Sequence, residues 1–160
     1  VDLSYVSEER PLGTAGALGL MAPPTEPLLV INGDILTNVD FRAMLAYHRE
    51  HKADLTVAVR RYEFQVPYGV LDCDGPYVQK LSEKPTYSFF VNAGIYLLEP
   101  AVHSFVQREK RFDMTDLIDA LLAQQRTVVS FPLVEYWLDI GQHADYQQAQ
   151  VDVASGRFRP

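Results

Sequence analysis

The sequence predicts a layered α/β domain in which helices pack on a mixed, largely parallel sheet. Segments with strand patterns alternate along the chain with segments that have helix patterns. A continuous apolar run at residues 28–31 is typical of a strand that is buried on both faces, as in the centre of a parallel sheet. The Asp-Gly dipeptide at residues 74–75 predicts a hairpin turn, so part of the sheet is expected to be antiparallel.

The first third of the chain contains two predicted strands and two predicted helices. Residues 1–6 alternate between apolar and polar side chains, which is the pattern of a half-buried strand. Thr14 can cap a short helix of small residues over 15–21, and the strand at 28–31 follows a loop rich in proline. Asp40 is the expected N-cap of a helix that ends near residue 52.

The middle third is predicted to consist of strands. Alternating apolar residues mark a strand at 54–61, and the hairpin joins strands at 69–72 and 77–81. The most apolar strand is expected at 89–98, where the tripeptide Asn92-Ala93-Gly94 interrupts it.

The last third returns to alternating helices and strands. A short helix is expected from Pro100 to about residue 107, because proline suits the first turn. Asp113 is the expected N-cap of a stronger helix whose apolar stripe runs to residue 122. The remaining predicted elements are strands at 127–132 and 136–138 and a final helix at 142–154.

Charge and cysteine content narrow the possible functions. Lys and Arg number 14, whereas Asp and Glu number 21, which gives a net charge of −7. A nucleic-acid-binding protein needs a cationic face, so this balance argues against one. The longest uncharged run, residues 11–25, is short and broken by Pro and Gly, so we expect no membrane span. Cys73 is the only cysteine and cannot form an internal disulfide, and we expect a cytoplasmic protein.

Two aspartates next to apolar strand segments are the first candidates for chemistry. Asp34 ends the motif Asn32-Gly33-Asp34 after the strand at 28–31, and Asp139 lies in the segment 136–141. Ligands of open α/β sheets bind beyond the carboxyl ends of the strands, and two carboxylates there can share one Mg²⁺ ion. The alternatives are an Asx turn at Asp34 and helix capping by Asp139.

Two further regions combine glycine with polar residues. Residues 11–17 read PLGTAGA, and such small residues let a ligand approach the backbone, although close packing is the better explanation for Gly16. The tripeptide at 83–85 is Glu-Lys-Pro, in which Lys84 can meet a phosphate and Glu83 can accept hydrogen bonds from hydroxyl groups; the alternative is a solvated Glu-Lys pair. Asn92 and Gly94 interrupt an apolar strand, so the amide needs a partner and the glycine indicates a close neighbour.

Taken in order, seven segments of the chain resemble the sugar-1-phosphate nucleotidyltransferase family. They are PLGTAGAL, LLVINGDIL, VPYGVL, LSEKP, FFVNAGIYLLEP, FDMTDLIDALL and YWLDIGQHADYQQA, and they run from Glu9 to about Ala149. PLGTAGAL is most similar to the mannose-1-phosphate guanylyltransferase branch, and YEFQVPYGV is similar to bacterial members that carry CBS modules. The resemblance implies a Rossmann-like α/β/α nucleotidyltransferase fold.

The resemblance also implies an activity and a set of site residues. Such enzymes transfer a nucleoside monophosphate, GMP from GTP in this branch, to a sugar 1-phosphate and release pyrophosphate. By resemblance, Asp34 and Asp139 hold Mg²⁺, Lys84 binds the sugar phosphate, and the backbone of Gly13 contacts the nucleoside. The residues implied around the sugar, which we expect to meet Lys84 in one cleft, are Tyr68, Gly69, Glu83, Asn92 and Gly94. A homo-oligomer is compatible with this family.

One departure from the family pattern shapes the domain assignment. The glycine-rich motif G-x-G-T-R-L and the Pro-Lys-Pro segment of the family do not occur in residues 1–160, and the chain begins at Val1. We therefore expect residues 1–160 to be the C-terminal part of one catalytic domain, inactive alone. Its sheet should be incomplete at the N-terminal side and should leave an exposed apolar edge or cleft there.

Two alternative functions remain open. One is a regulatory homologue that binds a nucleotide sugar without turnover. The other is a glycosyltransferase of similar architecture, which would usually carry an Asp-x-Asp metal motif after a strand. The nearest such motif, Asp72-Cys73-Asp74, falls at the predicted hairpin instead.

Overall fold

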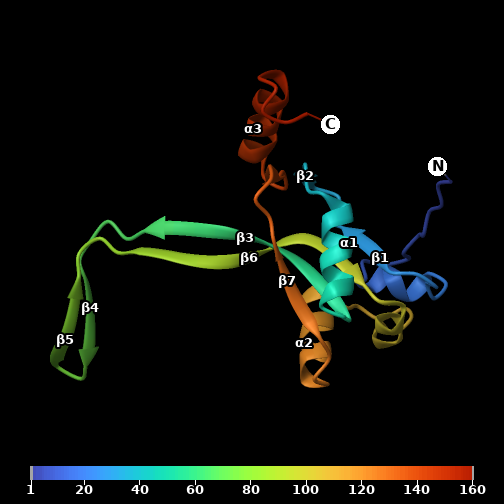
Figure 1. The fold of residues 1–160 in the computed structure, drawn as a ribbon, viewed down its shortest axis with the longest axis horizontal. Helices are drawn as coiled ribbons and strands as arrows, with labels where there is room; N and C mark the ends of the chain where they lie inside the picture. The colour runs from blue at the N-terminus through green and yellow to red at the C-terminus, as the bar shows by residue number, and fades with distance from the viewer. Residues whose placement is uncertain (1, 160) are drawn as a thin grey trace.

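The computed structural model describes residues 2–159, which fold around a four-stranded mixed sheet (Figure 1). The short 3-10 helices are η1 (Gly16–Leu20) and η2 (Pro100–Phe105), and the α-helices are α1 (Phe41–Glu50), α2 (Met114–Ala123) and α3 (His143–Ala154). The strands are β1 (Leu28–Ile31), β2 (Ile35–Thr37), β3 (Leu55–Gln65), β4 (Val70–Asp74), β5 (Tyr77–Ser82), β6 (Thr86–Leu98), β7 (Val128–Pro132) and β8 (Trp137–Asp139). None of these helices combines the length and apolar character that a membrane span needs.

The main sheet has the strand order β1-β6-β3-β7. β3 and β7 are parallel, whereas β6 is antiparallel to both of its neighbours, β1 and β3. Three of the four strands therefore run in one direction and β6 runs against them, which confirms the predicted mixed sheet. β2 pairs with β8 and β4 pairs with β5, each as a separate antiparallel pair.

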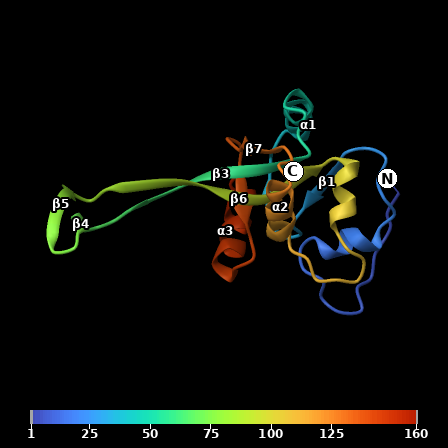
Figure 2. The same cartoon turned by 90° about the horizontal axis from the view of Figure 1, so that it is seen from below.

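Helices cover both faces of this sheet. On one face, Leu117 and Leu121 of α2 pack in a buried cluster with Leu55 of β3. On the other face, Met44 of α1 packs in a second cluster with Ile95 of β6. Because α1 and α2 lie on opposite sides of the sheet (Figure 2), the predicted α/β/α layering is confirmed.

β1 is an edge strand, which corrects the prediction that it lies in the centre of the sheet. Within residues 2–159 it pairs only with β6, and that pairing is antiparallel. Leu28 and Val30 pack against the core, whereas Leu29 and Ile31 are 37% and 40% exposed. An apolar run shows that a strand is suited to burial but not which of its faces is covered. Within residues 2–159, β1 therefore has one unpaired edge and one partly exposed apolar face, whereas the incompleteness of the sheet at its N-terminal side stays a prediction.

Three other local predictions are wrong or incomplete. Residues 2–6 are not a strand, because no neighbouring strand pairs with them, and Val1 lies outside the described residues. The helix expected at 15–21 is the five-residue 3-10 helix η1, not a regular α-helix. β2 was not predicted; it has three residues, and its partner β8 is about a hundred positions away in the sequence.

The outer halves of β3 and β6 leave the main sheet as a two-stranded ribbon, which ends in the β4–β5 hairpin (Figure 1). The strand register places Tyr62 opposite Phe89 and Phe64 opposite Tyr87. The ribbon therefore carries a row of aromatic side chains on one face, and the Asp72-Cys73-Asp74 tripeptide lies in its terminal hairpin.

A polar network fixes the C-terminal helix α3 to Tyr136, the residue that precedes β8. The Asp152 carboxylate accepts hydrogen bonds from Tyr136 Oη at 2.7 Å and Gln148 Nε2 at 2.8 Å, and Arg157 lies 3.6 Å away. The hydrogen bond from Tyr136 lowers the pKa of Asp152, while partial burial and the same carboxylate raise the pKa of Tyr136 to about 12. The network therefore favours ionised Asp152 and neutral Tyr136.

This network predicts a specific acid sensitivity. Because the pKa of Asp152 is lower in the folded chain, its contribution to stability is present above the usual aspartate pKa of about 3.9 and is lost as the pH falls through the folded value. We expect the melting temperature of the wild type to fall more steeply below about pH 4 than that of Asp152→Asn. Thermal unfolding across this range tests it, with Asp72→Asn, an exposed carboxylate on β4, as the control. Parallel curves for wild type and Asp152→Asn would contradict it.

Candidate active site

The β2–β8 pair brings Asp34 and Asp139 together. Asp139 is the last residue of β8 and is paired with Ile35, the first residue of β2. The Ile140 amide donates to the Asp34 carbonyl oxygen at 2.8 Å, which extends the pairing by one residue. Two aspartates that are 105 positions apart in the sequence therefore become neighbours across an antiparallel ladder.

The two carboxylates point toward the same small volume beside Gly141. A Cβ atom placed on Gly141 would lie 3.1 Å from Asp139 Oδ1 and 3.2 Å from Asp34 Oδ2. Both aspartates are exposed, and neither forms an ion pair with a described residue. This arrangement concentrates two negative charges on an open site and suits a hard divalent cation such as Mg²⁺.

The structure also bears on the alternative role of Asp139 as a helix cap. The N-cap of α3 is Gln142, and the Asp139 carboxylate accepts its hydrogen bond from the Gly141 amide at 2.9 Å. Asp139 therefore does not cap α3. Within residues 2–159, no three His, Cys, Asp or Glu side chains are placed to hold one metal ion, so a cation at the aspartate pair needs water or phosphate ligands as well.

Gly94 packs directly against the turn that carries Asp34. The Asn32 amide donates to the Gly94 carbonyl at 2.9 Å, and the Gly94 amide donates to Asn92 Oδ1 at 3.0 Å. Gly94 has φ +71°, and a Cβ there would lie 2.8 Å from Asn32 Nδ2 and 3.0 Å from Asn32 Cγ. The polar interruption of β6 is thus explained by a local partner for Asn92 and by the close approach of Asn32.

A cavity of about 530 Å³ that is widely open to solvent lies between two glycine-containing segments of the chain. It is lined by Thr14 from the PLGTAGA segment and by residues 30–34 of the segment that ends in Asn32-Gly33-Asp34. Asp34 is part of this lining, so the cavity adjoins the aspartate pair. Gly13 lies next to Thr14 and has φ +83°. The predicted nucleoside-contacting residue is therefore placed beside the cavity.

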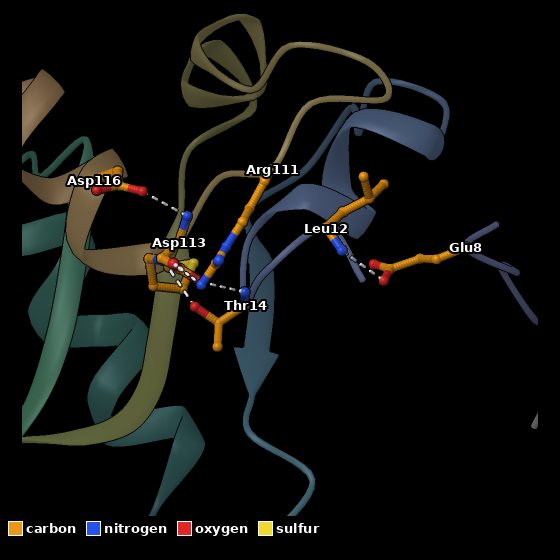
Figure 3. Close-up of polar contacts among 7 residues, drawn as sticks. Glu8, Leu12, Thr14, Arg111, Asp113 and Asp116 are labelled. Carbon is orange, nitrogen blue, oxygen red and sulfur yellow. Dashed lines mark hydrogen bonds and ion pairs between the residues drawn. The ribbon is translucent and has the colours of Figure 1, made fainter. Parts of the chain in front are cut away.

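Thr14 has a role that differs from the one predicted. It does not cap η1, whose N-cap is Ala15; its Oγ1 instead accepts a hydrogen bond from the Met114 amide at 2.9 Å, at the start of α2 (Figure 3). Thr14 is a site residue that the sequence did not predict, and the only sequence signal for it is its position in the glycine-rich segment at 11–17.

Close packing explains Gly16, as expected. A Cβ there would overlap Leu12 and lie 3.2 Å from the Lys110 carbonyl oxygen.

The expected single sugar cleft is not formed in this structure. Four of the predicted residues lie at the outer end of the ribbon: Tyr68, Gly69, Glu83 and Lys84. Gly69 is close to Glu83, since a Cβ on Gly69 would be 3.1 Å from Glu83 Oε2. The Lys84 carbonyl accepts a hydrogen bond from the side chain of Gln65. Asn92 is paired with Val59 within the main sheet. Six strand residues, or about 20 Å, separate it from the start of β6. The residues predicted to surround the sugar therefore form two separate groups. They come from different segments of the chain, and no local interaction requires these segments to meet.

The chain is similar in sequence to known nucleotidyl transferases. A family model described as Nucleotidyl transferase matches residues 1–156. The mannose-1-phosphate guanylyltransferase catalytic subunit beta of Drosophila pseudoobscura pseudoobscura is 32% identical over 154 residues, and the mannose-1-phosphate guanyltransferase of Pichia angusta is 31% identical over 155 residues. Each comparison covers 91% of this chain but only 41% and 42% of the relatives, so the chain spans about two fifths of their length.

Solved structures show the same similarity. HddC from Yersinia pseudotuberculosis superposes with a TM-score of 0.62 at 27% identity, covering 91% of this chain and 64% of that chain. A putative glucose-1-phosphate thymidylyltransferase from Bacillus anthracis superposes with a TM-score of 0.67, covering 92% of this chain and 63% of that chain. Its identity is 23%, so this second likeness concerns the fold alone.

Proposed function

Because this chain belongs to the nucleotidyl transferase family, we propose that the intact protein transfers a nucleoside monophosphate to a sugar 1-phosphate and releases pyrophosphate. The observation that carries the proposal is the Asp34–Asp139 pair beside the cavity lined by Thr14 and Asn32. The named guanylyltransferase relatives support GTP as the nucleotide and mannose 1-phosphate as the sugar substrate.

Each residue of this site has a proposed task. Asp34 and Asp139 would hold a Mg²⁺ ion, because one carboxylate oxygen of each exposed side chain is aimed at the same volume and Gly141 has no side chain that would occupy it. Bound Mg²⁺ would supply positive charge against the α-phosphate, where the sugar phosphate oxygen attacks and pyrophosphate departs. The segment at Gly13 and Thr14 and the turn at Asn32 orient the nucleotide from two sides of the cavity.

In this proposal, Glu83 and Lys84 at the outer end of the ribbon do not contact the aspartate pair. Glu83 and Lys84 are separated from Asn92 along β6, so the proposal for the metal and nucleotide part of the site does not depend on them. Asn92 and Gly94 shape the turn at Asn32, and in this proposal they act by positioning that turn.

Measurement of pyrophosphate release by the intact protein tests the function. We expect turnover with GTP and mannose 1-phosphate in the presence of Mg²⁺, and loss of turnover when EDTA removes the metal. Other nucleoside triphosphates and glucose 1-phosphate serve as the comparison substrates. Tight binding of a nucleotide sugar without pyrophosphate release from any pair would contradict the proposal and favour a regulatory homologue.

A further inference from the structure

We propose that Asp113 is a positioning residue that holds Thr14 in place at the nucleotide cavity; this inference rests on the proposed function. Asp113 is the N-cap of α2 and is not among the residues that line the cavity. Its carboxylate Oδ1 accepts a hydrogen bond from the Thr14 amide at 2.9 Å (Figure 3). Asp113 therefore acts on a bound nucleotide indirectly, through the segment that contains Gly13 and Thr14.

The contact between Thr14 and α2 is reciprocal. The Thr14 amide donates to Asp113 Oδ1, and the next residue of the helix, Met114, donates its amide to Thr14 Oγ1 at 2.9 Å. The amide and the hydroxyl of one residue are thus both bound by the first turn of α2. Two hydrogen bonds fix both the backbone and the side chain of Thr14, which is what a wall of a binding site requires.

Gly13 makes this contact possible. It has φ +83°, a conformation that residues with a side chain rarely adopt. A Cβ on Gly13 would overlap Asp113 Oδ1 and lie 2.8 Å from the Phe112 carbonyl oxygen. The backbone at residue 13 therefore rests directly on the start of α2, and the carboxylate of Asp113 occupies the space that any side chain would need.

Backbone hydrogen bonds on either side of Thr14 also attach residues 12–15 to the residue before Asp113, so the Asp113 side chain is not the only attachment of this segment. The Ala15 amide donates to the Phe112 carbonyl at 2.9 Å, and the Phe112 amide donates to the Leu12 carbonyl at 2.7 Å. These bonds do not involve the Asp113 side chain, so they persist when it is replaced. Loss of the carboxylate is expected to move Thr14 without detaching the segment.

Asp116 provides a matched control. Its Oδ2 accepts a hydrogen bond from the Asp113 amide at 2.9 Å, which completes the capping box of α2. The Asp116 side chain forms no hydrogen bond with residues 12–15: the Thr14 amide is bound by Asp113 Oδ1, and the Thr14 hydroxyl is bound by the Met114 amide. Both aspartates stabilise the helix N-terminus, but only Asp113 contacts Thr14.

Steady-state kinetics of the intact protein test the inference with four variants. We expect Asp113→Ala to raise the KM for the nucleotide about tenfold, with kcat and the KM for the sugar phosphate nearly unchanged. Asp113→Asn should stay within about threefold of the wild type, because its amide oxygen can accept the same hydrogen bond. Asp113→Glu keeps the charge but displaces the acceptor by one methylene, so it should raise the KM. Asp116→Ala should leave the KM unchanged.

Hydrogen exchange provides a readout that does not depend on turnover. Exchange at the Thr14 amide should accelerate in Asp113→Ala and not in Asp116→Ala, while both lower the melting temperature. Equal effects of the two alanine variants on KM and on exchange would show that Asp113 only caps α2 and would overturn the inference. Should Asp113→Ala fail to fold, the contrast between Asp113→Asn and Asp113→Glu decides: an equal KM in both variants overturns it. A wild type without turnover or nucleotide binding overturns the proposed function as well.

Discussion

Asp34→Asn and Asp139→Asn should each lower kcat of the intact protein about a thousandfold while leaving the fold intact. Each substitution removes one of the two charged oxygens that are aimed at the volume beside Gly141. Both side chains are exposed, so the free energy of unfolding should change by no more than about 0.5 kcal/mol. Rapid-quench or coupled pyrophosphate assays give kcat, and thermal unfolding monitors the fold.

The control for this pair is Asp119→Asn. Asp119 is an exposed carboxylate on α2, and it belongs to neither the aspartate pair nor the capping box. It carries the same change of charge, so any loss of turnover that it shares with the other two variants is a general electrostatic effect. The metal site is disproved when Asp34→Asn and Asp139→Asn both retain near-normal turnover at limiting Mg²⁺.

Gly94→Ala should lower turnover about a hundredfold and destabilise the fold by about 2–3 kcal/mol. The new Cβ would meet Nδ2, Cγ and Cβ of Asn32, so rotation of the amide alone cannot relieve the overlap. Asn32 cannot retreat freely either, because its backbone amide is bound to the Gly94 carbonyl. The turn must shift, and Asp34 lies only two residues further along it.

Gly75→Ala separates the backbone cost from the contact with Asn32. Gly75 also has a positive φ, +56°, but a Cβ there would have no atom within 4 Å. The same change should therefore cost only the backbone strain, about 1 kcal/mol, and leave kcat unchanged. Urea unfolding and the pyrophosphate assay on both variants provide the comparison, and similar kcat values for the two would refute the role of Gly94 in placing Asp34.

The features that the sequence predicted well depend on short-range chemistry. Asp40 caps α1 by accepting hydrogen bonds from the amides of Arg42 and Ala43, which lie within three residues of it. Asp113 forms a capping box with Asp116, three residues away. The positions of Asp34 and Asp139 beside apolar strand segments can also be read from the sequence, but their approach to each other depends on the β2–β8 pairing, and their binding of a metal ion stays a prediction.

The features that were missed depend on partners far away in the sequence. β2 has three residues without a distinctive pattern, and only pairing with β8 makes it a strand. The apolar sequence of β1 is compatible with a strand in the centre of a sheet and with a strand at its edge. Lys84 and Asn92 were grouped by resemblance, whereas their separation is set by the length of β6, which continues through both the main sheet and the ribbon.

The β2–β8 ladder also determines at which stage of folding the aspartate pair forms. It consists of three residue pairs and joins segments about a hundred positions apart, so it offers few contacts against a large loss of chain entropy. We therefore expect it to close late in folding and to open early in unfolding, before the main sheet separates. During synthesis no aspartate pair can form until β8 has left the ribosome. A ligand that binds both carboxylates would hold β2 and β8 together and delay their separation on heating.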